Sequence, residues 1–107
     1  MIAVEVQPLA GGGVALHMAG HAGAPTNLEG HDLVCAAASI LCCTMAEVIK
    51  AHCPRPVTEM ACGRAHLKGV PERGREAAFL AAWEGLLLGF KLLEKQYPRC
   101  LEVTGWR

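Results

Sequence analysis

The chain has 107 residues, of which 52% are hydrophobic, and its ten Lys and Arg balance its ten Asp and Glu. This length predicts one domain, residues 1–107, with a single hydrophobic core. A formal net charge of zero argues against a general nucleic-acid or anionic-membrane binder, which needs a basic surface. We therefore expect no direct nucleic-acid partner.

The first six residues do not resemble a secretory signal, because they lack a basic segment and Glu5 interrupts the apolar run. The longest apolar stretches are broken by Glu47 and Glu84, short of the roughly 18 apolar residues of a membrane-spanning helix. The sequence predicts a soluble, cytoplasmic protein with no membrane partner.

Six cysteines raise the question of a disulfide scaffold. A chain without a secretory signal belongs in a reducing compartment, and no pair has the C-x-x-C spacing of a zinc or redox site. Cys42 and Cys43 are adjacent, and adjacent helical residues do not face each other. We expect free thiols, and no role is assigned to Cys42, Cys43 or Cys62.

The first half of the chain predicts a hairpin, a loop and a helix. Apolar residues alternate over 2–7 and again over 14–19, with a glycine-rich turn at 8–13 between them. Residues 20–31 have the composition of a loop. Asp32 stands where a helix N-cap belongs, before an apolar helix over 33–51 that Cys53-Pro54 ends.

The second half repeats the pattern. Residues 57–61 and 64–68 predict a hairpin around Cys62-Gly63, followed by a helix over 73–96 and a strand over 100–104. The resulting order is ββαββαβ. It favours an α+β fold, a two-layer sandwich in which two helices cover one face of a mostly antiparallel sheet.

Gly85 and Gly89 would form a flat stripe on the second helix. The stripe suits close packing against the sheet or the first helix, or a contact with another subunit.

A thiol near a helix start is a candidate nucleophile. With Asp32 as N-cap, Cys35 is the third helical residue, where the dipole favours negative charge and free N–H groups can hold an oxyanion. Helix N-termini lower thiol pKa values, although a carboxylate close by opposes this. His21, at the end of the second strand, can act as the base. Asp32 can orient that histidine, and Ser39, four residues after Cys35, shares its helix face.

Other interpretations of these residues stay open. Packing explains most cysteines near helix starts, and a surface position explains most histidines after strands. His17, His21, His31 and Cys35 offer four nitrogen or sulfur ligands for a metal, but nothing fixes their geometry. His52 and His66 have no evident partners and are expected at the surface.

The pairing of Gly20-His21-Ala22 with Asp32-Leu33-Val34-Cys35-Ala36-Ala37-Ala38-Ser39 resembles the ribosomal-processing cysteine protease family, Prp. That family is marked by a G-H-A element, a loop, and D-[IL]-V-C-A-A-[VA]-S opening a helix. Its element order and its length of roughly 100 residues are similar to those of this chain. The Cys62-Gly63 turn departs from the family's pattern.

The resemblance implies a cysteine endopeptidase that removes the N-terminal extension of a large-subunit ribosomal protein. Cys35 would be the nucleophile and His21 the base, with Asp32 and Ser39 in support. The loop over 22–31 would cover the substrate, with Gly20, Ala22, Gly23 and Gly30 as its substrate-binding positions. The family implies a homodimer, and no cofactor or metal is expected. The alternative is a non-catalytic ribosome-assembly or peptide-binding module with the same fold.

Overall fold

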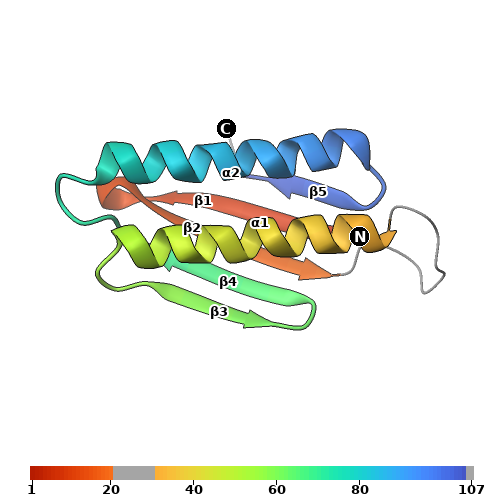
Figure 1. Ribbon diagram of the computed structural model, residues 1–107, viewed down its shortest axis with the longest axis horizontal. Coiled ribbons are helices and arrows are strands. Elements are labelled where there is room, and N and C mark those ends of the chain that lie inside the picture. The colour runs from red at the N-terminus through yellow and green to blue at the C-terminus, as the bar shows by residue number, and fades with distance from the viewer. Residues whose placement is uncertain (21–30, 106–107) are drawn as a thin grey trace.

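The computed structural model describes residues 1–20 and 31–105, without the side chains of residues 31 and 32. It has two layers (Figure 1): helices α1 and α2 lie side by side over one face of a five-stranded sheet. The predicted α+β sandwich and the order ββαββαβ are confirmed. No helix of the described residues lies on the opposite face of the sheet.

Strands β1 (Ile2–Leu9) and β2 (Gly13–Gly20) form the predicted antiparallel hairpin. Its connection is a short 3-10 turn, Ala10–Gly12, in which Gly11 and Gly12 have φ near +75°. Val4 and Val6 of β1 stand opposite Met18 and Leu16 of β2 on the helix-covered face. The period-two alternation in the sequence therefore placed the buried face correctly.

Helix α1 (His31–His52) packs on the sheet through one apolar side. That side consists of Val34, Ala38, Cys42, Met45, Ala46 and Ile49. The helix ends where the sequence predicted, with Cys53 N–H donating to the Ile49 carbonyl before Pro54. Leu33–His52 is long and apolar enough to cross a membrane, with a mean hydropathy of 1.8. Core helices pass the same test, and the inward side of α1 is buried against the sheet.

Strands β3 (Val57–Ala61) and β4 (Arg64–Gly69) form the second predicted hairpin. Helix α2 (Glu76–Gln96) begins three residues later than expected. It follows a turn in which Arg75 N–H donates a hydrogen bond to the Glu72 carbonyl. Its Gly89 meets Leu41 of α1, whereas a side chain at Gly85 would enter open space. Close helix packing therefore explains one of the two glycines.

Strand β5 (Leu101–Thr104) pairs parallel with β1, and all other neighbours pair antiparallel. The spatial order is β3-β4-β2-β1-β5, so the first hairpin lies in the centre. The largest fully buried side chains are Trp83, Phe79, Phe90, Leu16, Met45, Ile49, Leu67 and Leu101. The core is thus the apolar layer between the sheet and both helices.

Glu94 fastens α2 to the edge strand β5. Its Oε2 accepts a hydrogen bond from Val103 N–H at 2.8 Å, and its Oε1 accepts one from Lys91 Nζ at 2.9 Å. The Val103 hydrogen bond and then Lys91 hold the pKa of Glu94 below its ordinary value of 4.5. A lowered folded pKa adds stability above the unfolded pKa, and this is lost as pH falls through the folded pKa.

We expect Glu94→Ala to lower the free energy of unfolding by about 1 kcal/mol at pH 7. The deficit should shrink as the pH falls from 4.5 toward the lower pKa of folded Glu94, because the unfolded chain binds a proton at Glu94 before the folded chain does. Urea unfolding of the wild type and of Glu94→Ala, at pH 7 and at pH 3, measures the deficit at each pH. Glu47→Ala is the control, since its ion pair with Lys50 is exposed. A deficit of the same size at both pH values would contradict the role of the Glu94 charge.

Candidate active site

Cys35 is the fifth residue of α1, because the helix begins at His31. The expectation that Asp32 is the N-cap and Cys35 the third helical residue is wrong: the helix starts before Asp32, whose backbone lies in the first turn. The free N–H groups belong to the first four residues, 31–34. A helical Cα–Cβ bond tilts toward the N-terminus, so the Cys35 side chain leans back toward these donors.

Cys35 is half-buried at the wall of a cavity of about 260 Å³. Three segments meet there: the start of α1, the end of β2 and the tip of the β3–β4 hairpin, which lie at the same end of the molecule (Figure 1). The cavity is lined by Ile2, Met18, Gly20, Cys35, Ala38, Ser39 and residues 60–65. A thiol at the wall of a mostly apolar hollow is suitably placed to meet an extended peptide.

The structure brings Ser39 to the same cavity as Cys35, one helical turn further along α1. Ser39 is exposed, so its hydroxyl is accessible to a bound molecule. The expectation that these two residues share a face is therefore confirmed. Their catalytic roles, like that of Asp32, stay predictions.

Gly20 ends β2 and lines the cavity. Its φ is +102°, its N–H donates to the Gly63 carbonyl at 2.9 Å, and a Cβ there would collide with the Met1 carbonyl. Gly20 is thus a fixed strand residue, and its predicted place in the loop is wrong. His21 is the next residue in the chain, and His21, Ala22, Gly23 and Gly30 lie outside the described residues.

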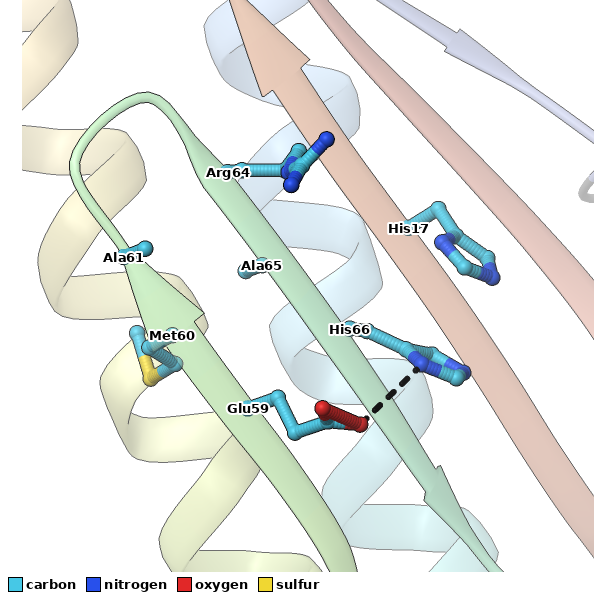
Figure 2. Close-up of a pocket in the computed structure, with 7 residues that line it drawn as sticks. All are labelled: His17, Glu59, Met60, Ala61, Arg64, Ala65 and His66. Carbon is cyan, nitrogen blue, oxygen red and sulfur yellow. Dashed lines mark ion pairs between the residues drawn. The ribbon is translucent and has the colours of Figure 1, made fainter.

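A second polar cluster lies on the sheet face that carries no helix (Figure 2). The rings of His17 and His66 stack with their centroids 4.1 Å apart, and His66 Nδ1 lies 3.7 Å from Glu59 Oε1. The expectation that His66 has no partner is therefore wrong.

The expectation that His52 is a surface residue without a partner is also wrong, because this residue is half-buried with its ring 5.9 Å from that of Phe79.

The sheet separates His17 from Cys35, so these two members of the suggested metal set do not share a site. His21 and the side chain of His31, the other members, lie outside the described residues. Within residues 1–20 and 33–105, no group of three or more His, Cys, Asp or Glu side chains is placed to hold a metal ion.

The family model described as "Cysteine protease Prp" matches residues 1–102. The chain belongs to the Prp family. The match covers the described cavity, residues 21–30 and all described strands but the end of β5, so it extends well beyond the short motif that carries the resemblance. No curated protein matches the sequence.

Several solved structures share this fold. The essential ribosomal processing protease Prp from S. aureus in complex with a substrate peptide has a TM-score of 0.76 and 21% identity, over 99% of this chain and 100% of that chain. The same S. aureus protease with a covalently linked product peptide has a TM-score of 0.75 and 25% identity, over 99% of this chain and 100% of that chain. SMU.848 from Streptococcus mutans has a TM-score of 0.71 and 20% identity, over 97% of this chain and 92% of that chain.

The hairpin wall of the cavity, residues 60–65, is the largest part of its lining that the motif does not contain; Ile2 and Met18 also lie outside the motif. A signal for it exists in the order of the elements. The end of β2 carries the Gly20-His21 element, and any strand that pairs antiparallel with β2 begins beside that end, as β4 does. The pairing itself joins residues more than forty positions apart in sequence, as in Ala19 with Arg64.

Proposed function

We propose that the protein is a cysteine endopeptidase that removes the N-terminal extension of a large-subunit ribosomal protein. The observation that carries the proposal is the place of Cys35, which follows the free N–H groups of α1 and lines a cavity between α1 and the β3–β4 hairpin. Membership of the Prp family supports the same chemistry.

In the proposed reaction, the Cys35 thiolate attacks the carbonyl carbon of the scissile peptide bond, with His21 as its partner. The oxyanion of the tetrahedral intermediate accepts hydrogen bonds from N–H groups at the start of α1. When this intermediate collapses, the C–N bond breaks and His21 donates a proton to the leaving amine. Water then attacks the thioester carbonyl, and Cys35 departs as the thiolate.

Two supporting residues fit this scheme. In this scheme Asp32, in the first turn of α1, has the role of orienting the His21 imidazole. Ser39 offers its exposed hydroxyl to the substrate or to the imidazole. Ile2, Met18 and Met60 give the cavity an apolar lining, which suits an apolar peptide segment before the cut.

We further propose that the protein acts in the cytoplasm as a homodimer. The outer side of the helix layer exposes large apolar residues on both helices, at Leu33 and Ile40 of α1 and at Leu88 and Leu92 of α2. Exposed apolar groups of this kind are typical of subunit contacts. Light scattering of the purified protein measures its mass, and a monomer at micromolar concentration would contradict the dimer.

The deciding experiment uses a synthetic peptide that spans the extension and first residues of the source organism's ribosomal protein. Incubation with the protein should give two products, whose masses define one cut. A peptide whose apolar residues before the cut are replaced by Ser should stay intact. If the natural peptide binds but is not cut, and Cys35 reacts with iodoacetamide at pH 6 no faster than free cysteine, the protein is a binding module.

A further inference from the structure

The cavity at Cys35 contains a second thiol. Cys62 lies in the turn between β3 and β4, and both Cys35 and Cys62 line the cavity, from opposite walls. Cys62 is exposed and Cys35 is half-buried, and neither is in a disulfide. Two reachable thiols in one small cavity are a feature that peptide cleavage by a single nucleophile does not use.

None of the other four cysteines shares this position. Cys42, Cys53 and Cys100 are buried in the core, and burial raises the pKa of Cys42 to about 11, with Cys43 adding to the effect. Cys43 is exposed but does not line the cavity. Cys62 is therefore the thiol placed to react with a modified Cys35, and Cys43 provides an exposed thiol for comparison.

The end of β3 and the hairpin tip bury few side chains. Strand β3 is an edge strand, and Glu59, Met60, Ala61 and Cys62 at its end are all exposed. Segments with few buried apolar contacts move at low free-energy cost. The Gly20 N–H to Gly63 carbonyl hydrogen bond keeps the tip beside the end of β2, on the side of the cavity. A disulfide needs Cα atoms within about 7 Å, so the tip must close toward Cys35.

We propose that Cys62 is a resolving thiol that forms a reversible disulfide with Cys35 after Cys35 is oxidised by a hydroperoxide. In the first step the Cys35 thiolate attacks one peroxide oxygen, the O–O bond breaks, and the hydroxide that leaves takes up a proton. Cys35 becomes a sulfenic acid. In the second step the Cys62 thiolate attacks this sulfur, the S–S bond forms, and the S–O bond breaks with loss of water. Two thiols and one hydrogen peroxide thus give one disulfide and two water molecules.

The disulfide has two consequences at this cavity. It occupies the Cys35 sulfur and draws the hairpin tip over the cavity, so the peptide is excluded. It also removes the sulfenic acid before further oxidation to the sulfinic acid, which a thiol reductant does not reverse. The cavity would therefore close under oxidation and reopen on reduction.

The test compares the wild type, Cys62→Ser and Cys43→Ser after brief treatment with hydrogen peroxide and quenching with catalase. Free thiols are blocked with iodoacetamide, and peptides are mapped by mass without reduction. We expect a Cys35–Cys62 cross-linked peptide in the wild type and in Cys43→Ser. In Cys62→Ser we expect Cys35 as sulfinic or sulfonic acid, increased about tenfold over the wild type. After dithiothreitol, Cys35 should regain labelling in the wild type and Cys43→Ser but not in Cys62→Ser.

The inference is overturned if Cys35 is oxidised in the wild type without linkage to Cys62, or if Cys62→Ser recovers labelling as fully as Cys43→Ser. A Cys35 that hydrogen peroxide leaves unmodified would also overturn it. The mapping needs no peptide cleavage, so it remains decisive if the proposed peptidase activity is absent. If the protein does cleave the peptide, the cleavage rate of each variant after dithiothreitol is compared with the rate of the same variant before peroxide treatment.

Discussion

Cys35→Ala is expected to abolish cleavage of the ribosomal-protein peptide, with a rate loss of about a thousandfold or more. Alanine cannot form the thioester, and a water molecule held in the cavity lacks the intrinsic nucleophilicity of a thiolate. The half-buried Cys35 side chain contacts the core only from its edge, so the thermal midpoint should change by no more than about 5 °C. A peptide assay read by mass and a thermal melt give the two values.

Two control variants separate the thiol from its surroundings. Ser39→Ala removes one hydroxyl from the same cavity and should lower the rate only about two- to tenfold, the value of one hydrogen bond. Cys43→Ala removes an exposed thiol that does not line the cavity, and its rate should equal that of the wild type. Retained cleavage in Cys35→Ala would refute the proposed nucleophile.

The elements that the sequence predicted well are those whose signals are local. The alternation over residues 2–7 and 14–19 reports a strand pair with one buried face, and the turn between them needs glycines with positive φ. Pro54 ends α1 because proline lacks the N–H that would continue the helix. Each of these depends on neighbours within a few residues.

The features that the sequence could not predict depend on contacts between distant segments. The start of α1 at His31 was missed because Asp32 is a good N-cap by itself, and the observed start precedes it. The stack of His17 on His66 exists only because β4 pairs with β2, and that register also sets the hairpin wall of the cavity. Single residues carry no signal for a pairing between distant strands.

The sequence placed two of the candidate site residues correctly. Cys35 and Ser39 line one cavity because a spacing of four puts them on one side of α1, which periodicity alone predicts. The opposing residues of the hairpin, Met60 to Arg64, come from a part of the chain without any local mark of function. The α1 side of the cavity therefore follows from the helix period, and the rest of its lining follows from sheet topology.

Phe90→Ala is expected to lower the free energy of unfolding by about 3–5 kcal/mol. The Phe90 side chain has no exposed surface and lies in the layer between the sheet and the helices. The neighbouring Gly89 packs closely against Leu41 of α1, and this contact limits how far α2 can shift to fill the cavity left by the ring. Because each kcal/mol moves the midpoint of a domain this size by about 4–8 °C, the melt should fall by roughly 15 °C or more.

Leu88 offers a matched control two residues away on the same helix. It is 60% exposed in the single chain but belongs to the proposed dimer surface, so the comparison is made at a protein concentration at which the chain is monomeric. There Leu88→Ala removes a side chain of similar character from the solvent side and should change the free energy of unfolding by no more than about 0.5 kcal/mol. Phe90→Leu keeps part of the volume and remains measurable if the alanine variant does not fold; its loss should lie between the two. Equal losses for Leu88→Ala and Phe90→Ala would show that α2 presents a different side to the sheet. The inward side of this helix, and with it the place of β5 that Glu94 holds, would then need revision.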